Sequence, residues 1–206
     1  MVNKNKKCRL CRREKTKLFL KGERCFSSKC PIDKKGAVPP GDHGLKSGFR
    51  LSDYGLQLRG KQKVKRFYGL GEKQLKNYFY QAIQMGGDAS DNLVYLLEAR
   101  LDNVVYRAGL APSRRTARQL VGHGHVKVND RKVTIPSYRV KKGDRLELSA
   151  KSGKISQVKN WLVKKDLEMP SWLERKGLIS RVKALPESKD WPSDFDSALI
   201  IEFYSR

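Results

Sequence analysis

Residues 113–128 read SRRTARQLVGHGHVKV, and this stretch indicates how the middle of the chain folds. Ser113 is a typical residue for capping the N-terminus of a helix. Arg114 and Arg118 are four residues apart, so they share one face of that helix. Residues 125–128 alternate polar and apolar side chains, as a half-buried strand does. The apolar positions of the helix form one buried stripe: Ala117, Leu120 and Val121. The stretch therefore predicts a short basic helix packed on a small sheet.

The flanking sequence extends this unit in both directions. Upstream, an apolar stripe over residues 91–108 predicts one continuous helix. Downstream, a turn at 129–130 and a returning strand at 133–135 predict a hairpin, and a further strand is expected at 145–148. We therefore expect an α+β module over residues 97–165, in which two helices pack on a short antiparallel hairpin sheet.

The region before the module reads as helical. Residues 36–48 are rich in Gly and Pro and indicate a linker or an extended arm. Ser52 is a candidate helix cap, and the helix that follows contains a strongly basic segment at 57–65. A second helix carries one apolar stripe: Leu75, Tyr78, Phe79, Ala82 and Ile83. We expect a mostly helical domain over residues 47–96, completed by the C-terminal segment 171–206.

The charge of the chain restricts its partners. The 206 residues include 45 Lys and Arg against 21 Asp and Glu, which gives a formal net charge of +24. Residues 1–68 alone hold 20 basic and 5 acidic side chains. So large an excess of one sign favours a polyanionic partner, and nucleic acid above all.

No stretch approaches the ~20 apolar residues of a membrane span, and the N-terminus lacks the apolar core of a secretory signal. We expect a cytoplasmic protein with no membrane partner.

Four cysteines form two closely spaced pairs in this basic N-terminal region. Their spacing predicts one zinc ion held in a knuckle over residues 1–46 by four thiolates: Cys8, Cys11, Cys25 and Cys30. Residues 1–46 contain too few apolar side chains to form a stable fold without a bound metal ion. A redox pair, two disulfides and an iron–sulfur cluster are the alternatives, and His43 is an alternative ligand. His123 and His125 could suggest a metal site or acid–base chemistry, but no carboxylate or cysteine stands near them at ligand spacing. We therefore interpret both as turn residues that contact RNA backbone.

Several motifs resemble a known family. The module matches the small RNA-binding unit called the S-four domain at five places, LEARLDNVVYR (97–107), SR (113–114), ARQLV (117–121), HGHVKVN (123–129) and PSY (136–138). Outside it, RLSDYGLQLR (50–59) and EFYSR (202–206) resemble the bacterial-type small-subunit ribosomal protein family of the same name, and the cysteine spacing is similar to that of its zinc-binding form.

The resemblance implies a function and a set of partners. It implies a structural constituent of the small ribosomal subunit that binds small-subunit rRNA as a primary binder and nucleates assembly of the subunit body. It further implies a place beside ribosomal protein five, near the side where messenger RNA enters, with an influence on decoding accuracy. It implies neither an enzymatic activity nor a small-molecule substrate.

The resemblance also implies an RNA surface on the module, made of Arg100, Asp102, Ser113, Arg114, Ala117, Arg118, Gln119, His123 and Asn129. The basic pattern adds candidates on the same helix and on the preceding domain: Arg115, Arg50, Arg59, Lys61, Lys63, Lys65 and Arg66. Asp130 departs from the family, which usually has Gly at this position. Aspartate tolerates a left-handed turn but adds a negative charge where RNA backbone would approach.

Two other classes of protein compete with this interpretation. An RNA-modifying enzyme can carry the same module, but it needs a catalytic domain larger than the residues left over here, and no nucleotide loop or nucleophile elbow is present. A zinc-dependent DNA-binding regulator is compatible with the cysteines, but no helix follows the second pair at finger spacing.

Overall fold

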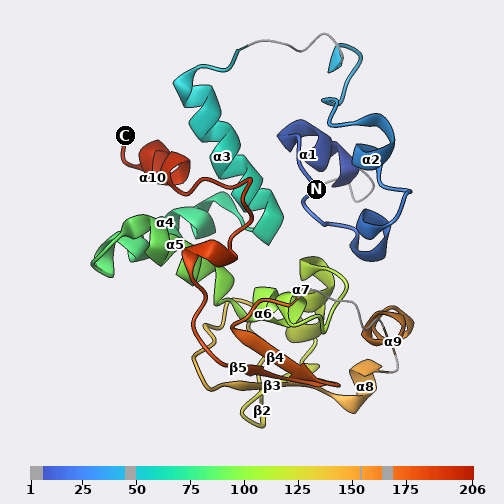
Figure 1. The fold of residues 1–206 in the computed structure, drawn as a ribbon. Coiled ribbons are helices and arrows are strands. Elements are labelled where there is room, and N and C mark those ends of the chain that lie inside the picture. Colours follow the sequence, from blue (N-terminus) through green and yellow to red (C-terminus); the bar gives the residue numbers. More distant parts are fainter. Residues whose placement is uncertain (1–6, 45–49, 154, 164–168) are drawn as a thin grey trace. The chain divides into compact units, whose positions relative to one another are not determined.

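The computed structural model describes residues 7–44, 50–153, 155–163 and 169–206 (Figure 1). The last part of the predicted linker, residues 45–48, lies outside the described residues. The chain divides into two compact units, one made of Met1–Ser90 and Pro192–Arg206, the other of Asp91–Trp191. No helix in the part of the chain described here has the length and apolarity needed to cross a membrane.

The first unit is built around the long helix α3 (Asp53–Tyr68). Ser52 caps it as predicted, because its hydroxyl accepts a hydrogen bond from Gly55 N at 3.2 Å. The helix ends at Gly69, whose φ of +66° is a left-handed conformation that glycine adopts without strain. Helix α4 (Glu72–Gln84) follows, and the C-terminal helix α10 (Ala198–Tyr204) packs against α3 and α4 (Figure 1).

The predicted stripe on α4 is narrower in the structure. Leu75, Phe79 and Ala82 are buried, whereas Ile83 is 50% exposed and Tyr78 is only partly covered. The three buried residues are spaced four and three positions apart and define the inward face of the helix, and Ile83 lies at the edge of that face.

The N-terminal part of the first unit consists of short helical segments joined by turns. They are α1 (Lys7–Glu14), the 3-10 helix η1 (Gly22–Phe26) and α2 (Pro31–Lys35). Leu18 is fully buried between them, and the rings of Phe19 and Phe26 stack with centroids 5.0 Å apart. Helix α1 contacts both α2 and α3.

The structure has two helices where the sequence predicted one continuous helix over residues 91–108. The structure has α5 (Ala89–Glu98) and α6 (Leu101–Arg107), and then α7 (Arg114–Gly122). Arg100 separates the first two with an extended backbone (ψ 136°) and forms a β-bridge with Arg139. Leu101 N donates to Tyr138 O at 2.8 Å. Backbone hydrogen bonds to the loop around Tyr138 and Arg139 replace helical hydrogen bonds at this point. The apolar periodicity of the sequence does not reveal such a contact with a distant segment.

A five-stranded antiparallel sheet completes the second unit, with strand order β2-β1-β3-β5-β4. The strands are β1 (Val126–Val128), β2 (Arg131–Lys132), β3 (Arg145–Leu148), β4 (Leu173–Lys176) and β5 (Ile179–Val182). The returning strand lies at 131–132 rather than 133–135. Residues 173–182 were assigned from the sequence to the helical domain. They instead form β4 and β5, which pair with each other, and β5 also pairs with β3, so only residues 192–206 of the C-terminal segment belong to the first unit.

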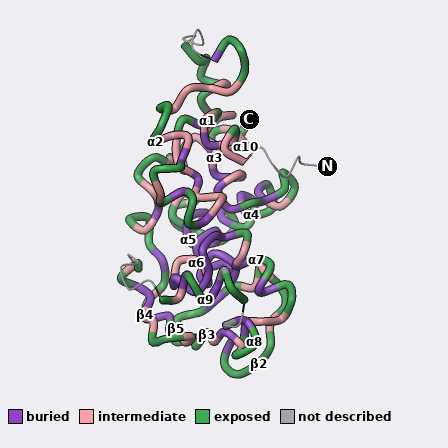
Figure 2. Tube along the Cα trace, turned by 90° about the vertical axis from the view of Figure 1, so that its right-hand side faces the viewer, coloured by how far each residue is buried: buried purple, intermediate pink, exposed green. Residues whose placement is uncertain are grey.

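One apolar core joins α6 and α7 to one face of this sheet. It includes Leu101, Val105, Leu120, Leu146 and Leu148, all at most 3% exposed. Figure 2 shows buried residues concentrated around α6 and α7 and exposed residues along the outer edge of the sheet. The short helix α9 (Ser156–Leu162) contributes Val158 to this core. The remaining short elements are helix α8 (Ala150–Gly153) and the 3-10 helix η3 (Ser188–Asp190). The observed fold is therefore helices combined with a small antiparallel sheet.

Candidate nucleic-acid interface

Helix α7 presents the predicted polar face. The Ser113 hydroxyl accepts from Thr116 N at 3.2 Å and so caps the helix as expected. Ala117 is fully buried, so it faces the core rather than a ligand. The exposed side chains of the helix and its C-cap are Arg115, Arg118, Gln119 and His123. These side chains are the part of the predicted surface that solvent and a ligand can reach directly.

Arg100 and Asp102 form a buried ion pair beneath this face. Arg100 is 1% exposed and donates to Asp102 through Nε at 3.0 Å and through a terminal nitrogen at 2.7 Å. Arg118, with its side chain 44% exposed, places a terminal nitrogen 3.6 Å from the same carboxylate. Arg100 therefore serves the fold, and Asp102 links the interior to an exposed arginine.

Arg114 is also turned inward, which differs from the expectation that it shares an open face with Arg118. It is 8% exposed, and its Nε donates to Asn103 Oδ1 at 2.7 Å. Its guanidinium lies 4.4 Å from the ring centroid of Tyr106. At the first turn of α7 the helix surface still faces the protein, so sequence spacing did not determine the exposure of this side chain.

Asn103 connects Arg114 to a second buried charge. Asn103 Nδ2 donates to Glu98 Oε2 at 2.8 Å and to Glu98 O at 2.9 Å. The fully buried Glu98 in turn accepts two bonds from Arg107, at 3.0 and 2.9 Å. Hydrogen-bonded partners compensate the desolvation of this carboxylate, and the network fixes the start of α7.

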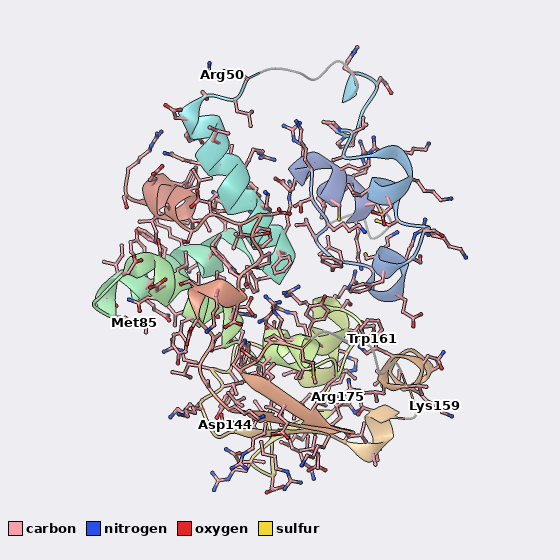
Figure 3. The ribbon with its side chains drawn as sticks, viewed as in Figure 1. Arg50, Met85, Asp144, Lys159, Trp161 and Arg175 are labelled. Atoms are coloured by element: carbon pink, nitrogen blue, oxygen red, sulfur yellow. The ribbon has the colours of Figure 1, made fainter. Side chains whose placement is uncertain are left out.

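The turn between β1 and β2 is held by side-chain bonds. Asn129 and Asp130 both have positive φ, +48° and +64°. Asn129 Nδ2 donates to Asp144 Oδ1 at 2.8 Å, and Asn129 Oδ1 accepts from Arg145 N at 2.9 Å. Figure 3 labels Asp144 in the sheet unit. Asp130 thus adopts a left-handed conformation, which glycine adopts without strain and aspartate tolerates, and its carboxylate is exposed.

The cations of α3 are mostly engaged within the first unit. Arg59 and Arg66 both pair with the buried carboxylate of Glu14, and Lys63 donates to Asp194 O at 3.0 Å. Burial raises the pKa of Glu14, although both arginines act in the opposite direction. Arg50 is exposed just before the helix and is labelled in Figure 3.

Lys61 is 5% exposed, so the structure does not present it to a ligand. It pairs with Glu72 at 2.5 Å and lies 4.0 Å from the ring centroid of Phe203. Lys65 and the Tyr204 hydroxyl also donate to Glu72, at 2.8 Å each. Burial alone would raise the pKa of Glu72, but these hydrogen bonds outweigh burial and lower it to about 2. This cluster fastens α10 to α3 and α4.

The four cysteines are free thiols, and three of them are buried: Cys11, Cys25 and Cys30. Lys21 N donates to Cys25 Sγ at 3.3 Å. Burial raises the pKa of Cys11 and Cys25, and the neighbouring thiols raise it further. Within the described residues, no three His, Cys, Asp or Glu side chains are grouped so that they could hold a metal ion.

Two family models match consecutive parts of the chain. The Ribosomal protein S4/S9 N-terminal domain matches residues 2–98, and the S4 domain matches residues 99–146. Similar proteins named small ribosomal subunit protein uS4 occur in Geotalea daltonii (50% identity), Thermosipho africanus (51%) and Thermus thermophilus (46%). Each similarity covers 97% of this chain and 96% of the relative.

The chain belongs to the uS4 family of ribosomal proteins. The resemblance of the motifs at 97–138 and 50–59 to that family is thereby confirmed. The uS4 family is one of ribosomal structural proteins rather than of enzymes.

Sequence reasoning missed exposed cations on the sheet of this uS4 family member. They lie on β1, β2, β3 and β5, at Lys127, Lys132, Arg145 and Arg181. Lys127 was visible as a polar position in an alternating pattern. Lys132 lay before the expected returning strand at 133–135, and β5 was not expected to be a strand at all.

Proposed function

We propose that this chain is a structural constituent of the small ribosomal subunit, where it binds small-subunit rRNA as a primary binder, nucleates assembly of the body and contributes to translational accuracy. The observation that carries the proposal is similarity to uS4 proteins along 97% of the chain. The exposed side of α7 and a net charge of +24 supply the matching chemistry.

In this proposal, the contacts to RNA come first from α7. Arg115 and Arg118 neutralise phosphates, and Gln119 and His123 donate hydrogen bonds to backbone or base edges. Asp102 holds Arg118 at 3.6 Å, which limits the orientations of that guanidinium before RNA binds. Folded RNA is recognised largely by shape and phosphate position, which suits an exposed helix without a deep base pocket.

The wider setting follows from the family resemblance. The proposed partners are small-subunit rRNA, neighbouring proteins of the subunit, especially ribosomal protein five, and messenger RNA at the side where it enters. The proposed location is a bacterial-type ribosome in the cytoplasm. No small-molecule substrate and no membrane partner form part of this function.

We include one zinc ion in the proposal, held by Cys8, Cys11, Cys25 and Cys30. Four thiolates are a donor set that zinc prefers, and the backbone bond from Lys21 N to Cys25 Sγ is of the kind that stabilises a thiolate. In the described residues these thiols are not grouped closely enough to hold an ion, so zinc would have to draw them together on binding. Bound zinc would link the short segments of the N-terminal part, and structural zinc contributes about 10–16 kcal/mol to coupled binding and folding in small domains.

A binding comparison tests the proposed function. The purified full chain is titrated with transcribed small-subunit rRNA and with duplex DNA of equal phosphate content at one fixed salt concentration. We expect tighter binding to rRNA than to DNA at that salt concentration, with an affinity that falls steeply as salt rises. Equal affinity for both nucleic acids would contradict the proposal.

A further inference from the structure

The sheet of the second unit has two different faces. One face packs against α6 and α7 through Val126, Val128 and Leu146. On β1 the burial alternates, so that Lys127 points to the opposite face and is exposed. The strands β3 and β5 follow the same alternation, with Arg145 and Arg181 exposed between buried neighbours.

Like charges are placed directly opposite each other on this second face. Lys127 is the register partner of Lys132, and Arg145 is the register partner of Arg181. Like charges at directly opposed positions destabilise an antiparallel pair. Two such pairs on one face of a small sheet oppose folding, and a polyanion lying over them would remove the repulsion.

Acidic side chains offset only part of this charge. Glu147 of β3 lies 3.2 Å from Arg145 and is the register partner of Lys127, although these two described residues form no ion pair with each other. Asp130 lies 3.8 Å from Arg145, and Glu174 pairs with Lys183 at 3.3 Å. Within the described part of the chain, no carboxylate comes within 4 Å of the amino groups of Lys127 and Lys132 or the guanidinium of Arg181. These three cations are therefore available to a ligand.

The cationic face is continuous with the end of α7. The Lys132 side chain lies against Gly124, so closely that a Cβ at Gly124 would come within 1.9 Å of Lys132 Cε. Gly124 follows His123, which caps α7 and belongs to the proposed interface. A phosphate backbone that contacts the C-terminus of α7 thus meets the ammonium of Lys132 next.

We propose that the open face of the sheet, through Lys127, Lys132, Arg145 and Arg181, is a second contact surface for the phosphate backbone of RNA. The inference rests on the proposed function, since it extends the rRNA interface from α7 onto the sheet. Recognition by these side chains is electrostatic and independent of base identity.

Charge-removing variants of the full chain test the surface, with transcribed small-subunit rRNA as the probe. For the variant Lys127→Gln with Lys132→Gln we expect rRNA affinity to fall about three- to tenfold and the slope of log affinity against log salt to flatten by about 1.5. The melting temperature stays unchanged or rises, because the repulsion between the two lysines is gone. A purely structural role for these lysines predicts a lower melting temperature.

Two further variants act as controls. Glu147→Gln removes a negative charge from the same face, and we expect it to raise rRNA affinity. The matched variant Lys73→Gln with Lys76→Gln removes two exposed charges from α4 and should change affinity less than twofold, with the slope unchanged. An equal loss in this control would mean that net charge, rather than the sheet face, determines binding, and would overturn the inference.

The failure of this inference can be told apart from failure of the proposed function. If the unaltered chain shows no preference for rRNA, the proposed function fails. A second outcome is that the unaltered chain binds rRNA, Arg118→Ala lowers the affinity, and the sheet variants bind rRNA normally. In that case only the proposed sheet surface is refuted. Normal rRNA binding by the sheet variants together with weaker binding of poly-glutamate would assign this face to an acidic protein instead.

Discussion

Arg114 donates a 2.7 Å hydrogen bond from Nε to the buried amide oxygen of Asn103, whereas Arg118, one turn further along the same helix, remains 44% exposed. Two arginines at helical spacing thus have different roles. The first one joins α7 to α6, and the second is held at the surface by Asp102. This difference can be measured, because the two side chains contribute to different equilibria.

We expect Arg114→Ala to lower the free energy of unfolding by about 2–3 kcal/mol, since it removes a buried charge-assisted hydrogen bond and the contact with Tyr106. Arg118→Ala should cost less than about 1 kcal/mol, as expected for an exposed ion pair, but should flatten the salt dependence of rRNA binding by about one unit. Denaturant unfolding and filter binding measure the two effects. Equal loss of stability in both variants would contradict the assignment.

Lys61 and Lys63 provide a second comparison, on α3. Lys61→Ala removes a buried partner of Glu72, and we expect the first unit to lose about 2–3 kcal/mol of stability. Lys63→Ala affects an exposed bond to a carbonyl and should change stability by about 0.5 kcal/mol or less. Chemical unfolding followed by circular dichroism separates them. A larger effect for Lys63 would show that the burial of Lys61 contributes little.

The acid stability of the first unit should depend on Glu72. Its pKa is lowered to about 2 in the folded chain from an ordinary value of 4.5, so its stabilising contribution is complete above pH 4.5 and is lost as pH falls toward 2. Glu72→Gln should remove this part of the acid dependence. Unfolding measured from pH 6 to pH 2 tests it, and Tyr204→Phe, which removes one hydrogen bond to Glu72, should give an intermediate curve. Parallel curves for all three proteins would contradict the prediction.

The turn at Asn129 and Asp130 should respond differently at its two positions. Asp130→Gly relieves a left-handed residue and removes a negative charge, so we expect stability to rise by up to about 1 kcal/mol and rRNA affinity to increase. Asn129→Ala loses the bonds to Asp144 and Arg145 and should cost about 1–3 kcal/mol. Thermal unfolding and filter binding test both positions. A loss of rRNA affinity in Asp130→Gly would mean that the carboxylate itself contributes to binding.

Metal content tests the cysteine knuckle. We expect about one zinc per chain by elemental analysis, and chelation should remove order from the N-terminal part while leaving the second unit folded. Cys25→Ser should lose the metal, whereas Ser27→Ala, in the same loop, should retain it. Iron, or no metal in protein purified without chelators, would refute the zinc assignment.

The sequence predicted the elements whose signals are local. Ser52 and Ser113 mark the starts of helices, and each acts through atoms within a few residues of itself. Alternation likewise predicted the strand at 125–128. By contrast, β4 (LERK) and β5 (ISRV) are short and carry charges, so only the pairing of β5 with β3 and of β4 with β5 makes them strands.

The interface could be predicted only as a set of residues. Arginine and lysine are exposed in most proteins, so the burial of Arg100, Arg114 and Lys61 was not visible in a sequence. Each is buried because a specific acceptor meets it: Asp102, Asn103 and Glu72, respectively. Whether such a partner exists depends on tertiary packing, which spacing does not encode.

The C-terminal helix has a consequence for how the chain is made. Helix α10 packs on α3, so the first unit combines residues 1–90 with residues 192–206, which the whole second unit separates in the sequence. Residues 91–191 are continuous and can fold as soon as they leave the exit tunnel. The surface of α3 that receives α10 stays uncovered until residues 192–206 have followed the whole second unit out of the tunnel.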